Sequence, residues 1–108
     1  MVKQGDIIQI SFDPSIGHEQ KKTRPALVVS SNRFNVLTRA ALLCPISHAK
    51  DFPLHIDLPA GIRTDGKVLC EHIRSMDIET RGYTKIETVP QEFMNYISEL
   101  CQLLFRQN

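Results

Sequence analysis

Long apolar runs, paired cysteines and an excess of charge of one sign are all missing from this 108-residue sequence. No stretch approaches the roughly 20 apolar residues of a membrane-spanning helix, and the first residues lead directly into a strand pattern. We therefore expect a cytoplasmic protein without a membrane partner. The formal net charge is only +1, so any contact with nucleic acid must come from a local cluster of basic side chains.

The cysteines are few, odd in number and far apart, at Cys44, Cys70 and Cys101. This spacing gives neither a C-x-x-C site nor a disulfide framework. All three lie in apolar segments. We expect them to be small buried side chains in a reducing compartment.

Motifs for metal and cofactor chemistry are also absent. The histidines form no H-x-H or H-x₃-H pair; they are His18, His48, His55 and His72. The sequence has no P-loop, no dinucleotide fingerprint and no G-x-S-x-G serine elbow. We expect no metal and no cofactor, which leaves chemistry by side chains alone.

Apolar periodicity predicts one domain, residues 1–108, dominated by strands. Ile8, Ile10 and Phe12 alternate with polar residues, and Pro25 opens an apolar run typical of a strand covered on both faces. Strands are expected over residues 8–12, 25–29, 40–46, 52–58 and 67–73, the last continuing in one reading to 78. A polar loop is expected over 15–24 and a short helical turn, capped from 30–32, over 34–37.

The last segment changes period and predicts a helix. Phe93, Ile97, Leu100, Cys101 and Leu104 form one apolar stripe at helical spacing. Several short strands followed by one helix indicate a mainly β (α+β) fold, a small and strongly bent antiparallel barrel with the helix packed outside it.

Arg24 is the first candidate for chemistry. It ends the polar loop and immediately precedes an apolar strand, so a rigid scaffold can hold its guanidinium toward a groove, as binding of a phosphate requires. The alternative is a solvated loop with an Arg–Glu surface pair, and composition alone favours that alternative.

Ser47 and Glu71 each have two readings. Ser47 ends a buried strand, where its hydroxyl either begins the next turn or donates to a phosphate oxygen. Glu71 shares strand parity with Leu69 and Ile73, so it pairs with a cation or lines a cleft, where burial would raise its pKa toward useful general-base values.

Together these groups suit RNA cleavage by internal transesterification. That reaction needs a base for the 2′-hydroxyl proton, a cation for the phosphorane and an acid for the leaving 5′-oxygen, and none of these roles requires a metal. The nucleophile belongs to the substrate, which explains a choice of RNA over DNA.

At this point the sequence resembles the MazF/PemK/Kid toxins over nearly its whole length. The most specific segments are D-P-x-x-G-H-E-Q, from Asp13 to Gln20, and T-R-P-A-L-V-V, from Thr23 to Val29. Further segments in the family's order are 5–7, 44–47, 52–58, 66–69, 74–77, 81–82 and 89–90.

The resemblance implies an SH3-like barrel of the PemK/CcdB type that works as a homodimer. It implies sequence-specific cleavage of single-stranded mRNA with 2′,3′-cyclic phosphate and 5′-hydroxyl products. It also implies inhibition by a cognate antitoxin of the MazE/PemI type, whose disordered tail occupies the RNA groove. A rival within the same fold is a CcdB-like toxin that binds and inhibits DNA gyrase without catalysis. A second rival is an inactive RNA-binding relative.

The resemblance also implies site residues. The catalytic set is Arg24, Ser47, Glu71 and His18, and the residues in contact with RNA are Glu19, Gln20, Lys22, His48 and Leu69. The hydroxyl residue that matches Ser47 is usually Thr. In the plasmid-borne branch an arginine stands where this sequence has Leu69, and Arg74 has the opposite strand parity, so we do not expect Arg74 to replace it.

Overall fold

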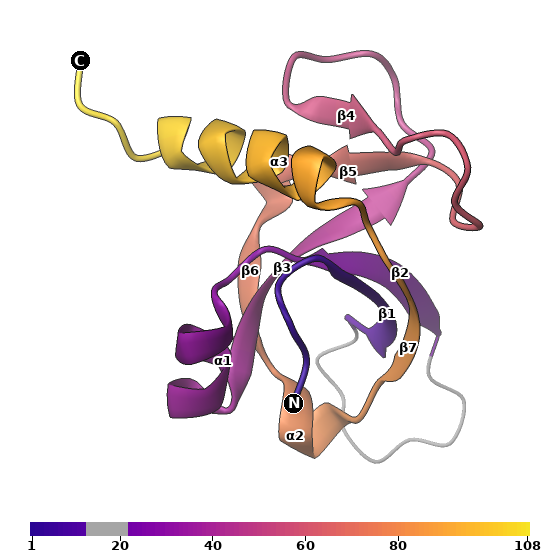
Figure 1. Cartoon of the computed structure of the whole chain (residues 1–108), viewed down its shortest axis with the longest axis vertical. Helices are drawn as coiled ribbons and strands as arrows, with labels where there is room; N and C mark the ends of the chain where they lie inside the picture. Colours follow the sequence, from indigo (N-terminus) through magenta and orange to yellow (C-terminus); the bar gives the residue numbers. More distant parts are fainter. Residues whose placement is uncertain (13–21) are drawn as a thin grey trace.

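The computed structural model describes residues 1–12 and 22–108 (Figure 1). Its strands are β1 (Asp6–Ser11), β2 (Thr23–Val28), β3 (Ala40–Ser47), β4 (His55–Asp57), β5 (Lys67–Leu69), β6 (Arg74–Asp77) and β7 (Thr84–Thr88). Its helices are α1 (Asn32–Thr38), α2 (Ile78–Arg81) and α3 (Gln91–Leu103), with a 3₁₀ turn, η1 (Cys70–His72), between β5 and β6.

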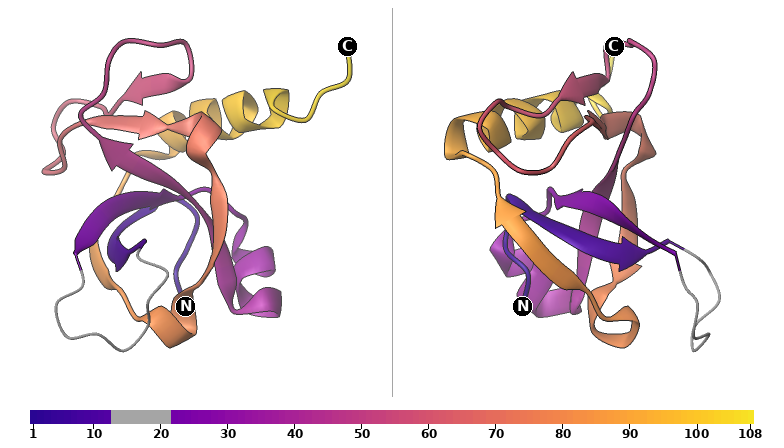
Figure 2. Two further views of the ribbon diagram at one scale, coloured as in Figure 1. Left: turned by 180° about the vertical axis from the view of Figure 1, so that it is seen from behind. Right: turned by 90° about the vertical axis from the view of Figure 1, so that its right-hand side faces the viewer.

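The strands form one bent antiparallel sheet in the order β4-β5-β3-β2-β1-β7, with β6 paired to the first half of β3. Views from three sides show the strands curling around an interior while α3 lies across one side (Figures 1 and 2). The predicted mainly β fold with a C-terminal helix is confirmed. Within the described ranges β6 and β7 do not pair, so the sheet is not closed.

The sheet buries both of its faces, as the apolar runs predict. Ile7 and Leu27 belong to a core cluster between the sheet and α3, whereas their neighbours Ile8 and Val28 belong to a second cluster inside the curled strands. A fully buried side chain of this kind contributes about 1.5–3 kcal/mol, so the strands supply most of the hydrophobic stabilisation. The three cysteines are buried as free thiols in the cluster under α3, which confirms their expected place.

The helix α3 follows the predicted stripe. Met94, Ile97 and Cys101 are buried against the sheet, while Tyr96 and Leu103 stay about half exposed on the outer face. The predicted helical turn near residue 34 is also confirmed as α1, capped by a hydrogen bond from the Phe34 amide to the Ser31 hydroxyl. Within the described residues no helix has the length and apolar character needed to cross a membrane.

The expected strand 67–73 is wrong in a way that shapes the site. The chain pairs Val68 with Ile46 and Arg74 with Leu43, and between these pairs it leaves the ladder as η1, opposite Cys44 and Pro45. A proline lacks the amide hydrogen that a central ladder needs, so a break opposite Pro45 is physically reasonable.

Other boundaries differ from expectation as well. The strand β2 begins at Thr23, so Arg24 lies inside a strand and not in the polar loop. The strand β4 is shorter than expected, and the predictions contained neither β7 nor α2. These missed elements are short and half-exposed, and they lack a strong apolar period.

Candidate active site

Sheet register brings Arg24 and Ser47 together. Ala26 pairs with Pro45 and Leu27 with Cys44 in the antiparallel ladder of β2 and β3. Arg24 precedes Ala26 by two residues and Ser47 follows Pro45 by two, so both residues stand at the same end of this ladder. The ladder itself ends at Ala26 and Pro45, and Ser47 pairs instead with Lys67 of β5.

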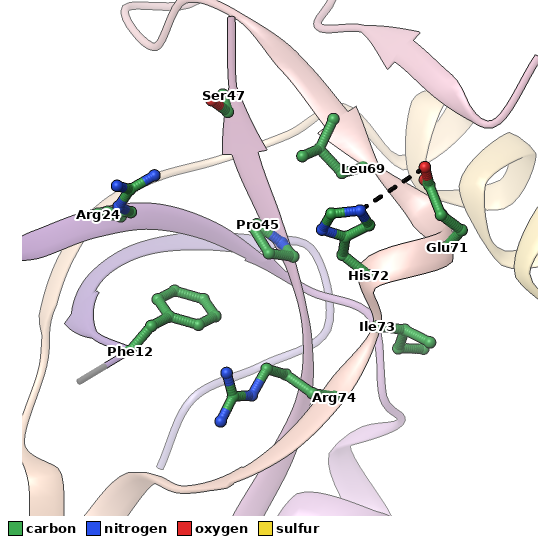
Figure 3. Close-up of a pocket in the computed structure, with 9 residues that line it drawn as sticks. All are labelled: Phe12, Arg24, Pro45, Ser47, Leu69, Glu71, His72, Ile73 and Arg74. Carbon is green, nitrogen blue, oxygen red and sulfur yellow. Dashed lines mark ion pairs between the residues drawn. The ribbon is translucent and has the colours of Figure 1, made fainter. Parts of the chain in front are cut away.

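Both residues line a pocket of about 640 Å³ at the open end of the curled strands (Figure 3). Pockets for small ligands typically have about 300–1,000 Å³. The nine residues that line it are Phe12, Arg24, Pro45, Ser47, Leu69, Glu71, His72, Ile73 and Arg74. The pocket thus joins predicted residues from β2, β3, β5 and η1 in one place.

The Arg24 guanidinium and the Ser47 hydroxyl are both available to a ligand. Arg24 is exposed and has no ion pair or side-chain hydrogen bond to any residue in 1–12 or 22–108. The simpler alternative from the sequence was a surface ion pair between Arg24 and a glutamate. Arg24 forms no such pair with any described residue. The backbone of Ser47 is held in place by its neighbours. It pairs with Lys67, and Gly66 lies so close that a Cβ atom added to Gly66 would be 3.1 Å from the Ser47 carbonyl oxygen.

Glu71 lines the pocket and also has a cationic partner. Its Oε2 lies 2.6 Å from Nε2 of His55 on β4 and 3.8 Å from Nε2 of His72. Burial acts to raise the pKa of Glu71, but its own backbone amide and His55 outweigh burial, and the pKa is lowered. The net shift is opposite to the one expected from burial alone, because that expectation included neither the Glu71 amide nor His55.

Arg74 lines the same pocket as Leu69 and Glu71, against the parity argument. That argument assumed an unbroken strand, whereas η1 resets the direction in which successive side chains point. The guanidinium carbon of Arg74 lies 5.5 Å from the centre of the Phe12 ring, a cation–π distance. The pocket therefore contains a second guanidinium besides Arg24.

The remaining predicted residues lie in different places. Leu69 lines the pocket and is 8% exposed, whereas Lys22 is exposed and does not line it. His48 lines a separate hollow with Asp65, whose carboxylate is 3.6 Å from its ring. His18, Glu19 and Gln20 lie outside the described residues. In 1–12 and 22–108 no three His, Cys, Asp or Glu side chains converge into a group suited to a metal ion.

The sequence analysis missed two contributors to the site, His55 and Phe12. The alternation of β4 suggested His55 as a polar residue on a half-buried strand, without a partner. Its partner Glu71 lies 16 residues later, so only the β4–β5 pairing of His55 with Leu69 brings them together. Phe12 was expected only as an apolar residue of a half-buried strand, and it is half-buried at the edge of the inner cluster.

In chemical terms the pocket combines two guanidinium groups, one hydroxyl and one paired carboxylate. Guanidinium groups bind phosphate oxygens bidentately, and a hydroxyl donates to a third oxygen. A chain with a formal net charge of only +1 thus concentrates positive charge at one hollow, which is the local cluster that a binder of anionic phosphodiesters needs.

Comparison with known protein families shows the family of this chain. The model of the PemK-like, MazF-like toxin of type II toxin–antitoxin systems matches residues 3–105. The chain belongs to this family. The resemblance stated from the sequence is therefore confirmed.

Relatives within the family are similar along most of their length. Endoribonuclease PemK of Escherichia coli is 37% identical over 89% of this chain and 76% of its own. Endoribonuclease EndoA of Bacillus subtilis is 34% identical over 95% of this chain and 93% of its own. A crystal structure of MazF from Deinococcus radiodurans superposes with a TM-score of 0.81 at 32% identity, covering 95% of this chain and 94% of that one.

Proposed function

We propose that this chain is a toxin endoribonuclease that cuts single-stranded mRNA at specific sequences, without a metal, by attack of the RNA's own 2′-hydroxyl. The observation that carries the proposal is that Arg24 and Ser47 line one pocket. The relatives named as endoribonucleases agree with it. Because mRNA is its substrate, the protein acts in the cytoplasm.

In the proposed reaction the 2′-oxygen loses its proton and bonds to the adjacent phosphorus. The bond from phosphorus to the 5′-oxygen breaks, and that oxygen receives a proton. The products are a 2′,3′-cyclic phosphate and a 5′-hydroxyl. Arg24 stabilises the charge that develops on the phosphorane, and Ser47 donates a hydrogen bond to a non-bridging oxygen. The participation of His18 and Glu71 in proton transfer, and of Glu19, Gln20, Lys22, His48 and Leu69 in RNA contacts, stays a prediction.

Arg74 adds a phosphate contact in this proposal. We expect Arg74→Ala to bind a 2′-deoxy RNA analogue more weakly than the parent at every sequence. For single strands, loss of one phosphate contact reduces the slope of log K against log salt by about 0.7. Arg33→Ala, an exposed arginine on α1 outside the pocket, is the matched control and should leave affinity and slope unchanged. An Arg74→Ala variant with the parent's salt slope would contradict the contact.

The partners follow from the same proposal. A MazE–MazF structure from Deinococcus radiodurans superposes on this chain with a TM-score of 0.82 at 32% identity. We assign this chain a cognate antitoxin of the MazE/PemI type, whose tail covers the pocket and competes with RNA.

The second proposed partner is another copy of the chain. The C-terminal segment has exposed apolar side chains that suit a homodimer contact, at Tyr96, Leu103 and Phe105.

One assay separates this function from its rivals. Purified protein is incubated with a long single-stranded RNA in EDTA, and the cut ends are mapped and tested for 2′,3′-cyclic phosphate. We expect cleavage in EDTA with cyclic phosphate ends. Intact RNA together with measurable gyrase binding would support the CcdB-like inhibitor. Bound but intact RNA would support an inactive relative, and a requirement for a divalent metal would overturn the mechanism.

A further inference from the structure

His55 and Glu71 form an ion pair in the wall of the pocket. The Nε2 of His55 lies 2.6 Å from the Glu71 carboxylate, and its Nδ1 lies 2.9 Å from the carbonyl oxygen of Lys50. Carboxylate and carbonyl oxygens only accept hydrogen bonds, so both ring nitrogens donate and the ring is an imidazolium. The Lys50 carbonyl raises the pKa of His55, and Glu71 adds to this effect against burial.

This pairing changes what Glu71 can do. A general base is most effective when its pKa lies near the working pH, and His55 helps to lower the pKa of Glu71 away from that range. The same contact keeps the carboxylate charged and fixes its orientation. Its Oε1 is buried and accepts no hydrogen bond in the described part of the chain, whereas the side chain as a whole is 28% exposed. A ligand therefore reaches the carboxylate at Oε2, which can accept a second hydrogen bond beside that from His55.

The position of Glu71 favours contact with a base over contact with the scissile phosphate. Figure 3 shows Arg24 and Ser47 together at one side of the pocket and Glu71 at the other, with Pro45 and Leu69 between them. When the scissile phosphate binds at Arg24, the adjoining nucleotide lies over these apolar side chains. Proteins recognise single-stranded RNA through the hydrogen-bonding edges of such unstacked bases.

We propose that Glu71, held charged and oriented by His55, selects an amine-bearing base next to the scissile phosphate by accepting a hydrogen bond from it. Glu71 is then a specificity-determining residue in place of the proton-transfer role that the family resemblance implies, and His55 is its positioning residue. This inference rests on the proposed function, because it requires an RNA in the pocket.

The chemistry of the bases sets the direction of the preference. Adenine, cytosine and guanine each offer an exocyclic amine on the Watson–Crick edge, and carboxylates accept from such amines. Uracil offers a single ring N–H between two carbonyl oxygens, which repel a carboxylate. We therefore expect the cleavage motif to contain one position, next to the cut, from which uracil is excluded.

Glu71→Gln tests this preference directly. A carboxamide both donates and accepts, so it tolerates uracil where a carboxylate rejects it. Cut sites are mapped on a random RNA pool for the parent, for Glu71→Gln and for Glu79→Gln, a glutamate on α2 that pairs with Arg39 outside the pocket. The discrimination against uracil at that position should fall about tenfold to a hundredfold in Glu71→Gln only.

His55 is tested by the pH dependence of the same discrimination. The charged groups around Glu71 are His55 and His72, with Lys67 near His55 but paired with Asp57 and Asp51. Without the imidazolium the pKa of Glu71 is lowered less, so as the pH falls below 7 His55→Ala should lose discrimination at a higher pH than the parent does. If His55→Ala is unfolded by thermal melting, His55→Gln takes its place, since it keeps a donor but not the charge.

Three outcomes would overturn the inference. The first is a uniform loss of cleavage in Glu71→Gln with an unchanged motif, which would make Glu71 a general base. The second is an unchanged rate and motif in Glu71→Gln. The third is a His55 variant with the parent's pH profile. If the parent itself cuts no RNA, the proposed function fails, and this result is distinguishable because it precedes any comparison of variants.

Discussion

Arg24→Ala is expected to abolish detectable RNA cleavage while leaving the fold intact. Removal of one group that stabilises transition-state charge costs about 10²–10³ in rate, and a guanidinium that also positions the phosphate falls at the upper end or beyond. Arg24 is exposed and unpaired within the described residues, so its loss removes no structural contact there. The measurement is the initial rate of cleavage of a short RNA containing the mapped motif, in EDTA.

Two variants control this experiment. Arg33→Ala removes an exposed arginine from α1 and should cleave like the parent. Arg24→Lys keeps the charge but not the bidentate geometry, so its rate should lie between those of the parent and Arg24→Ala. Cleavage by Arg24→Ala within tenfold of the parent, with an unchanged melting temperature, would contradict the assigned role of Arg24.

The second large effect concerns the substrate. An RNA whose 2′-hydroxyl is replaced by hydrogen only at the nucleotide before the cut is expected to resist cleavage completely. The attacking oxygen is absent, and no group in the proposed mechanism activates water in its place. Its affinity for the protein should stay close to that of the unmodified RNA, because the proposed contacts of Arg24 and Arg74 are to phosphate and not to the 2′-hydroxyl.

The control carries the same replacement two nucleotides further from the cut, where cleavage should proceed normally. Affinity is measured by fluorescence anisotropy, and cleavage by gel analysis of end-labelled RNA. Any cutting of the modified bond would mean that water or another hydroxyl is the nucleophile, and internal transesterification would then be wrong.

The Arg24–Ser47 pair was predictable from two kinds of signal. Strong apolar runs predict strands after Pro25 and before Ser47, and both runs are buried on both faces of the sheet. Each candidate stands at the end of one run, but the residues alone left its role open, and the family resemblance implied the pair. The structure puts both residues in one pocket.

The other wall of the pocket was less predictable because its signals are non-local. The sequence from Val68 to Ile73 resembles a continuous strand, and the break becomes visible only when Pro45 is recognised as its neighbour across the sheet. Because of this error, the Arg74 side chain was expected to point away from the pocket that it lines. The lowered pKa of Glu71 was also missed, since it depends on the Glu71 amide in the 3₁₀ turn and on His55 in another strand.

The most direct test is the structure of the protein bound to the 2′-deoxy RNA. We predict that the Arg24 guanidinium and the Ser47 hydroxyl both lie within hydrogen-bonding distance of non-bridging oxygens on the one phosphodiester that is cut in normal RNA. A complex in which that phosphodiester lies outside the pocket, or in which only one of the two side chains contacts it, would contradict the account.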